Sequence, residues 1–342
     1  LTPIVTYPII FEASSFWYRF LKKICHLLRR LKLKTMRQSN ELIYAIILKK
    51  GLGFIRTRKE RGMRLVKEIL RIYREKTVSG QRRRMRMSKA RGSIFITGAG
   101  SGMGRLAARN YAEEGYEVAA VDINEHGLLE TAENHQNIRT FNVDVTNFDA
   151  VCSAVDEAEK ELGPIRRALN AAAIMPLGKV LDQDIKIFHK VMDINYNGVV
   201  NVSKAVLPKL LERNRGELIN FASVAGWIPI LYMSAYNASK FAVVAFTEVL
   251  HHEHQDSDVR ILCVCPPPVK TPLLDQARET VWPRVFDQAK HIEPEDVLSA
   301  IDKTLKEDGL FVFPGKGTQW QQRVRRWFPN VLWRSVHKAE GF

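Results

Sequence analysis

Residues 93–104 read Ser-Ile-Phe-Ile-Thr-Gly-Ala-Gly-Ser-Gly-Met-Gly. The apolar run at 93–97 predicts a short buried strand, and a helical pattern that begins at Arg105 follows the glycines directly. Glycines let a backbone approach a phosphate closely, and the first turn of a helix offers unpaired N–H groups and a partial positive charge. The stretch therefore predicts a dinucleotide site, although Met103 occupies the last glycine position of the general Gly-x-Gly-x-x-Gly pattern.

Short apolar runs and helical patterns alternate along the rest of the chain, as expected for a parallel sheet flanked by helices. We expect an α/β fold, a doubly wound parallel Rossmann sheet in three layers. The second strand ends in Asp122, at the offset where an acid meets the adenosine ribose. The predicted strands begin near Ser93, Glu117, Ile138, Ala168, Glu217, Arg260 and Leu310.

Tyr236 and Lys240 stand four residues apart on a predicted helix, and Ser223 lies thirteen positions before the tyrosine. Positions i and i+4 share one helix face, so a phenol and an ammonium can converge on one bound molecule. The cation is expected to favour phenolate and to lower the pKa of the tyrosine. Such a tyrosine can exchange a proton with an alcohol oxygen while hydride moves at the adjacent carbon. Taken alone, the same pair also occurs on helices as ordinary surface residues.

Together these motifs resemble the short-chain dehydrogenase/reductase family over roughly residues 93–313. The segment 97–104 matches the family's cofactor turn, and Asp144-Val145 matches the adenine-contacting step after the third strand. Asn170-Ala171-Ala172-Ala173 lies where the family has Asn-Asn-Ala-Gly. The positions that match the catalytic tetrad are Asn195, Ser223, Tyr236 and Lys240.

The resemblance implies a role for each of these residues. Tyr236 is expected to be the general acid/base, and Lys240 to lower its pKa and to bind the nicotinamide ribose. Ser223 is expected to hold the substrate oxygen, and Asn195 to support a proton relay through water. From the residues alone, Ser223 is better explained as a helix cap or turn serine, and Asn195 as a polar residue inside a helix that the backbone satisfies. The expected cofactor-binding residues are Thr97, Gly98, Ser101, Gly102, Met103, Gly104, Asp122, Ile123, Asp144, Val145, Asn170, Ala171, Ala172, Tyr236, Lys240, Pro266, Val269 and Thr271.

Two residues depart from the family pattern. Ala173 replaces the usual glycine after the fourth strand and adds a methyl group near the expected nicotinamide path. Pro267 replaces the glycine of a Pro-Gly step, and proline fixes φ and has no N–H. Either change lowers activity or only reshapes the site.

Charge at the end of the second strand indicates which cofactor is used. The Asp122 carboxylate can accept hydrogen bonds from both ribose hydroxyls, and it repels a phosphate at the 2′ position. Ile123 and Asn124 follow it, so no basic residue compensates directly. Ser101 stands where relatives that prefer NADP often carry Arg or Lys, and Arg105 is expected on the helix flank. We expect NAD to be preferred over NADP.

The basic charge of the 342-residue chain comes from its first part. Residues 1–92 hold 25 Lys and Arg against 5 Asp and Glu, whereas residues 93–342 hold 27 against 32. We expect 1–92 to be a basic extension, helical or disordered, followed by a catalytic domain at 93–313 and an aromatic, basic tail at 314–342. The extension could lie on an anionic membrane or contact nucleic acid, the latter being less favoured. No apolar run in it reaches the roughly 18 residues that span a bilayer.

Met87-Ser88 reads like an ordinary start just before the first strand. Residues 1–86 are therefore equally well interpreted as translated upstream or fused sequence and as a genuine basic arm. The four cysteines form neither a disulfide scaffold nor a metal-ligand pattern, so we expect no metal and a cytoplasmic location.

The apolar segment 226–233 and the expected lid at 271–290 indicate a lipophilic alcohol or ketone as substrate. Packing or subunit contact would explain the same residues, because relatives are commonly homodimers or homotetramers. Tail aromatics beside arginines allow peripheral membrane contact or docking on the domain. The function expected is NAD(P)-dependent hydride transfer at a secondary alcohol, and the alternative is a dinucleotide-binding sensor or scaffold without enzymatic activity. Candidate pocket residues are Trp227, Leu231, Met233, Leu273, Leu274 and Trp282.

Overall fold

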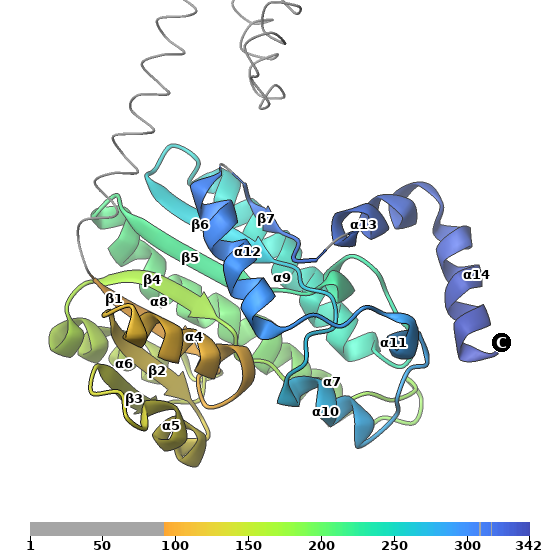
Figure 1. The fold of residues 1–342 in the computed structure, drawn as a ribbon, viewed down its shortest axis with the longest axis horizontal. Coiled ribbons are helices and arrows are strands. Elements are labelled where there is room, and N and C mark those ends of the chain that lie inside the picture. Colours follow the sequence, from red (N-terminus) through yellow and green to blue (C-terminus); the bar gives the residue numbers. More distant parts are fainter. Residues whose placement is uncertain (1–91, 308, 316) are drawn as a thin grey trace, which may run out of the picture. The chain divides into compact units, whose positions relative to one another are not determined.

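The computed structural model describes residues 92–307, 309–315 and 317–342, without the side chains of 320–324. Seven strands form one parallel sheet in the order β3-β2-β1-β4-β5-β6-β7 (Figure 1). The predicted fold class is confirmed. The strands are β1 (Ser93–Thr97), β2 (Glu117–Asp122), β3 (Ile138–Asn142), β4 (Ile165–Asn170), β5 (Gly216–Phe221), β6 (Val259–Val264) and β7 (Phe311–Val312).

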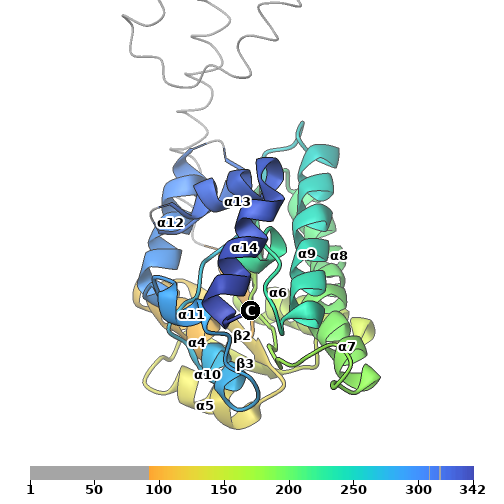
Figure 2. The ribbon, with the colours of Figure 1, turned by 90° about the vertical axis from the view of Figure 1, so that its right-hand side faces the viewer.

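Helices cover both faces of the sheet, which makes three layers. One face packs against α4 (Gly102–Glu113), α5 (Glu125–Ala132) and α12 (Pro294–Lys306). The other face packs against α6 (Phe148–Leu162), α8 (Gly198–Glu212) and α9 (Ser234–Glu253). Figure 2 shows α12 on one side of the sheet and α8 and α9 on the other.

The first strand shows why this arrangement forms. All five of its residues are buried, because each face of a parallel sheet carries a layer of helices. Successive side chains point to opposite faces, so Ile94 and Ile96 join the core under α4 and α12 while Phe95 joins the core under α6 and α8.

The strand order places a ligand crevice at one point of the sheet. The chain runs outward from β1 through β2 to β3, then returns to pair β4 on the opposite side of β1. Such a reversal leaves a crevice at the carboxyl ends of the strands, between the connections that diverge. The short elements around this crevice are α7 (Ile185–Met192), a π-helical turn η1 (Asp193–Asn197), a 3-10 turn η2 (Val224–Gly226), α10 (Pro272–Arg278) and α11 (Val285–Gln288).

Two helices complete the chain, α13 (Thr318–Trp327) and α14 (Pro329–Glu340) (Figure 2). The Arg325 guanidinium donates to the Trp227 carbonyl at 2.8 Å, and the Glu340 carboxylate accepts from the Val285 N–H at 2.9 Å. The tail thus docks on both the η2 turn and the α11 helix. The predicted extension 1–92, apart from Gly92, lies outside the described residues, and the proposed boundaries at 92 and 313 stay predictions.

Candidate active site

The glycine turn lies where the sequence predicts it, between β1 and α4. Gly98 and Gly102 have φ values of +69° and +48°, which favour glycine. A Cβ on Gly104 would lie 2.2 Å from the Gly98 carbonyl oxygen, so the close packing of helix on strand requires glycine there. Ser101 is the N-cap residue of α4, and its side chain makes no capping hydrogen bond.

A cavity of about 680 Å³ opens beside this turn. It extends from Asp122 and the 143–146 segment to Thr271, Leu273 and Gln276 near the start of α10. Of the predicted cofactor residues, it brings together Gly98, Ser101, Gly102, Met103, Gly104, Asp122, Ile123, Asp144, Val145, Ala171, Ala172 and Thr271. A cavity lined by a glycine turn, a helix N-terminus and a strand-end carboxylate fits a dinucleotide.

Asp122 also braces the glycine turn. Its Oδ2 accepts from the Gly100 N–H and its Oδ1 from the Asn124 N–H, each at 2.9 Å. A Cβ on Gly100 would lie 2.9 Å from the Asp122 carboxyl carbon, so this contact requires glycine. Each carboxylate oxygen has further lone pairs, so Asp122 can still accept from ribose hydroxyls.

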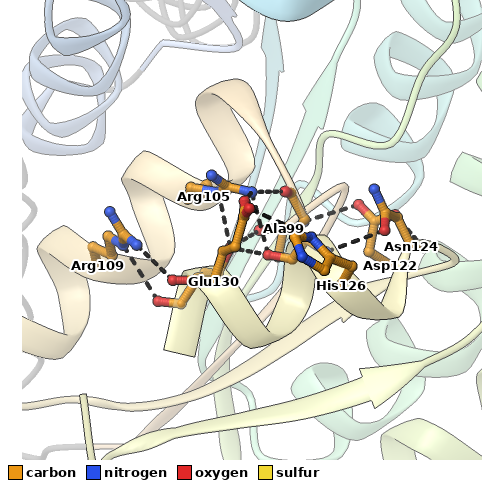
Figure 3. Close-up of polar contacts among 10 residues, drawn as sticks. Ala99, Arg105, Arg109, Asp122, Asn124, His126 and Glu130 are labelled. Carbon is orange, nitrogen blue, oxygen red and sulfur yellow. Dashed lines mark hydrogen bonds and ion pairs between the residues drawn. The ribbon is translucent and has the colours of Figure 1, made fainter. Parts of the chain in front are cut away.

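Arg105 does not line the cavity, and Figure 3 shows its side chain directed at Glu130 of α5. Its guanidinium donates to the Gly100 carbonyl, contacts the Glu130 carboxylate at 2.6 Å, and donates to the Thr131 hydroxyl at 3.1 Å. Arg109 donates to the Glu130 carbonyl at 2.5 Å and so holds the end of α5. These two arginines join α4 to α5 behind the turn, and neither lines the cavity.

A smaller cavity of about 90 Å³ adjoins the first, and both are lined by Met103, Ala171, Ala173, Thr271 and Leu273. Ser223, Tyr236 and Lys240 line this smaller cavity together. The predicted cofactor residues Pro266 and Val269 line it as well.

The three side chains are held by specific contacts. Ser223 Oγ accepts from the Ala225 N–H at 3.1 Å, which starts the η2 turn directly after β5. Tyr236 and Lys240 come from the first turns of α9. The buried Lys240 Nζ lies 5.6 Å from the Tyr236 ring centroid and donates to the Phe221 carbonyl at 2.8 Å.

The pKa of Tyr236 differs from the expectation. Burial raises it to about 12, and a hydrogen bond with Ser223 opposes this effect only in part. Burial also lowers the pKa of Lys240 to about 8, against the opposing influence of Cys263 and Cys265. The expectation of a lowered tyrosine pKa is therefore wrong for this structure, because the loss of solvation on burial outweighs the hydrogen bond with Ser223.

Asn195 lies in the π-helical turn η1 and is fully buried. Its Oδ1 accepts from the Ile174 N–H at 2.8 Å, and its Nδ2 donates to the Ile174 carbonyl at 3.0 Å and to Ser239 Oγ at 3.1 Å. Asn195 thus ties the segment after β4 to α9, but it lines neither cavity. Its expected role in a proton relay stays a prediction.

Two predicted cofactor residues lie away from both cavities. Thr97 is buried, and its hydroxyl accepts from the Ala172 N–H at 3.4 Å. The Asn170 amide donates to Asn220 Oδ1 at 2.8 Å across the neighbouring strand. Their side chains line neither cavity, and their expected role in cofactor binding stays a prediction.

The wall of the smaller cavity is mostly apolar. Met233, Leu273 and Leu274 line it as predicted, whereas Trp227, Leu231 and Trp282 do not. Trp227 packs edge-on against Phe311 at 5.1 Å, and Trp282 against Phe286 at 5.2 Å. Further lining residues, among them Met175, Pro268 and Phe286, were not predicted, because single apolar residues in loops and very short helices carry no periodic signal.

Both departures from the family pattern border the site. Ala173 lines both cavities, and Pro267 lines the smaller one. Carbonyl groups fix the proline segment, since Pro266 accepts from the Val224 N–H at 2.9 Å and Pro268 from the Ile292 N–H at 3.1 Å. The position of this loop therefore does not depend on an N–H at residue 267.

Cys263 in β6 and Cys265 just after it are buried free thiols whose sulfurs lie 3.8 Å apart. Within the described ranges, His, Cys, Asp and Glu side chains form no cluster of three or more that could hold a metal ion. Cys25 lies outside the described residues.

Comparison with known proteins agrees with this site. Residues 93–282 match the sequence family described as short chain dehydrogenase. The chain is 30% identical over 285 residues to 17-beta-hydroxysteroid dehydrogenase 13 of Rattus norvegicus, covering 81% of this chain and 92% of that protein. It is 32% identical over 235 residues to 2-(S)-hydroxypropyl-CoM dehydrogenase 3 of Xanthobacter autotrophicus, covering 64% and 91%.

A solved structure shares the fold. The short chain dehydrogenase/reductase of Burkholderia phymatum in complex with NAD aligns with a TM-score of 0.64 at 25% identity, covering 70% of this chain and 95% of that one. With the glycine turn and the Ser223, Tyr236 and Lys240 cluster in place, the chain belongs to the short-chain dehydrogenase/reductase family of oxidoreductases.

Proposed function

We propose that this protein is an NAD-dependent dehydrogenase or reductase that interconverts a lipophilic secondary alcohol and its ketone. One observation carries the proposal. Ser223, Tyr236 and Lys240 line a small apolar cavity that adjoins the larger cavity at the glycine turn. A substrate in the smaller cavity and a dinucleotide in the larger one would meet at the residues that line both cavities.

The side chains of this cluster supply proton chemistry. The Ser223 and Tyr236 hydroxyls lie close enough to hold one substrate oxygen between them. A tyrosine with a pKa of about 12 is neutral near pH 7, so it is ready to donate a proton to a carbonyl oxygen. A bound nicotinamide cofactor supplies the hydride for the carbonyl carbon. Lys240 holds positive charge beside the phenol and favours the phenolate that forms.

Asp122 supports a preference for NAD. Its carboxylate borders the larger cavity, while Arg105, the nearest cation of the turn, is bound to Glu130 and does not line the cavity. At the end of β2, a 2′-phosphate would therefore meet the negative charge of Asp122 without a compensating charge from Arg105. Replacing Asp122 with serine should reduce the ratio of NADPH to NADH dissociation constants by about fivefold or more, since a nearby like charge contributes roughly 1 kcal/mol even in a wet site. An unchanged ratio would argue against the preference.

The apolar wall supports a lipophilic substrate. Met175, Ile230, Met233, Leu274 and Phe286 surround the catalytic hydroxyls and offer no charge. Such a wall binds by excluding water and fixes orientation through the two hydroxyls. The name of the relative 17-beta-hydroxysteroid dehydrogenase 13 is consistent with an apolar alcohol.

The direct test is to incubate the protein with NAD and a panel of lipophilic secondary alcohols and to follow NADH absorbance. Turnover that the Tyr236→Phe variant lacks would support the proposal. NADH binding without turnover across the panel would instead favour a non-enzymatic sensor or scaffold. The departures from the family pattern at Ala173 and Pro267 are the observation that favours this alternative.

We further propose a cytoplasmic homodimer or homotetramer that contacts membranes peripherally. No helix in the described part of the chain is both long and apolar enough to cross a bilayer. The exposed aromatic and basic side chains of α13 and α14 support contact at the lipid surface. Sedimentation analysis tests the oligomeric state.

A further inference from the structure

Three basic side chains that belong to no recognised motif line the larger cavity from α7. Lys186, His189 and Lys190 are spaced by three and four residues, so they share one helix face. All three are exposed. Among the described residues, no ion pair or side-chain hydrogen bond engages them.

Helix electrostatics explains only part of this placement. A cation in the last turn stabilises a helix by facing its negative end, which suits His189 and Lys190. Lys186 stands in the first turn, where the positive end of the helix disfavours a cation. A separate reason is needed for a lysine at that position facing the same cavity.

The acidic side chains that line this cavity already have donors of their own. Asp122 accepts from two backbone N–H groups, Asp144 accepts from the Thr146 N–H at 2.9 Å, and Asp193 accepts from the Asn197 amide at 2.9 Å. None of them forms an ion pair with the α7 side chains. The α7 cations therefore remain available to an anion in the cavity.

The glycine turn, residues 98–104, supplies no basic side chain of its own to a bound diphosphate. It offers backbone N–H groups, and its nearest cation, Arg105, is bound to Glu130 and the Gly100 carbonyl. A diphosphate carries two negative charges, and lysine ammonium groups are effective point-charge partners for phosphate.

We propose that Lys186, His189 and Lys190 bind the diphosphate of the nicotinamide dinucleotide and complement the N–H groups of the glycine turn. This inference rests on the dinucleotide site of the proposed function. It assigns to α7 a part in cofactor binding that no sequence motif predicts.

Titration of the full chain with NADH, ADP and adenosine tests the proposal without any substrate. The variants are Lys186→Gln, Lys190→Gln and the double variant, and Lys179→Gln is the matched control. Lys179 is exposed in the same segment but does not line the cavity. Each lysine should contribute about threefold to the NADH and ADP dissociation constants, and the pair about tenfold, as expected for solvent-screened charge contacts.

Adenosine affinity and the Lys179→Gln control should stay unchanged, and the double variant should show a weaker dependence of NADH binding on salt. Lysine variants that bind NADH and ADP as tightly as the unmodified protein would overturn the proposal. A loss confined to NADPH would also overturn it, because it would assign the cations to a 2′-phosphate. Absence of NADH binding by the unmodified protein would instead refute the proposed function. Equal melting temperatures across the set show that the variants fold.

Discussion

At the scale of single residues, solvation governs the catalytic cluster. Lys240 and Tyr236 are both buried, and each is driven toward its neutral form, the lysine by a lowered pKa and the tyrosine by a raised one. The Phe221 carbonyl compensates the buried ammonium with one hydrogen bond. The fold thus holds the proton on the phenol, which suits a donor to a ketone oxygen.

Removing the Tyr236 hydroxyl should abolish this proton donation. Tyr236→Phe is expected to lower turnover by about 10³-fold, within the range of general acid–base catalysis, while NADH affinity changes little. Steady-state rates and NADH titration measure the two effects. Tyr196→Phe is the control, because Tyr196 packs on Phe246 and lines neither cavity. Equal turnover in Tyr236→Phe and the unmodified protein would remove the tyrosine from the mechanism.

Burial of Lys240 should make stability depend on pH. Its pKa falls from 10.5 to about 8 on folding, so between these values the unfolded chain binds more protons than the folded protein. The free energy of unfolding therefore rises with pH in this window, by about 1.4 kcal/mol per pH unit. Relative to Lys240→Met, the native protein should gain about 3 kcal/mol between about pH 8 and pH 10.

Urea unfolding of both proteins across this range measures the gain. Tyr236 and Cys263 titrate in both proteins, so their contributions largely cancel in the difference. The raised pKa of Tyr236 lowers stability only above about pH 10, where the unfolded tyrosine ionises. A difference that does not vary with pH would show that Lys240 titrates as an exposed lysine does.

At the scale of elements, the glycine turn is fixed by contact with its neighbours. Gly104→Ala would place a methyl group against the Gly98 carbonyl, and neither backbone segment can yield without moving α4 away from β1. We expect a loss of about 1–3 kcal/mol in unfolding free energy and a weaker NADH affinity. Ser101→Ala should leave the unfolding free energy nearly unchanged, because the Ser101 side chain makes no capping hydrogen bond. Thermal melts compare the stability of the two variants, and NADH titration measures the affinity of Gly104→Ala. Equal melting temperatures for the two variants would contradict this account of the turn.

Strands and motifs are the elements that the sequence predicts well. Three predicted starts, Ser93, Glu117 and Ile138, coincide with the observed ones, and the other four lie within three residues. Apolar runs bounded by turn residues carry this information locally. The helix after the glycine turn begins at Gly102 instead of Arg105, because Ser101 takes the N-cap position.

Long-range geometry is what the sequence does not reveal. The raised pKa of Tyr236 depends on burial by several separate elements. The π-helical turn that places Asn195 against Ile174 has no sequence signature. The cavity-facing cations of α7 look like an ordinary solvated helix face until the glycine turn is brought beside them.

At the scale of the whole molecule, charge and exposed apolar surface meet at the C-terminus. We call the exposed residues Arg326, Trp327, Phe328, Val331, Arg334, Lys338 and Phe342 the C-terminal patch. Its apolar side chains are 56–76% exposed. Residues 93–342 carry a net negative charge, whereas the charged side chains of the C-terminal patch are all basic. A twofold contact between two copies would bring like charges together, whereas an anionic lipid surface would neutralise them.

Reversing charge within the patch should therefore weaken binding to lipid. Arg334→Glu/Lys338→Glu is expected to reduce the affinity of the full chain for vesicles of phosphatidylcholine and phosphatidylserine by at least about tenfold, since each basic group near such a surface contributes about 1 kcal/mol. Lys303→Glu/Lys306→Glu carries the same change in net charge on exposed positions of α12 and should bind nearly as the unmodified protein does. Vesicle flotation measures all three proteins. All three proteins retain residues 1–92, so any attraction of that basic segment to the lipid is the same in each. A difference in vesicle affinity between the two double variants can therefore come only from a local contact of α14. Equal affinities for them would place the lipid contact elsewhere in the chain.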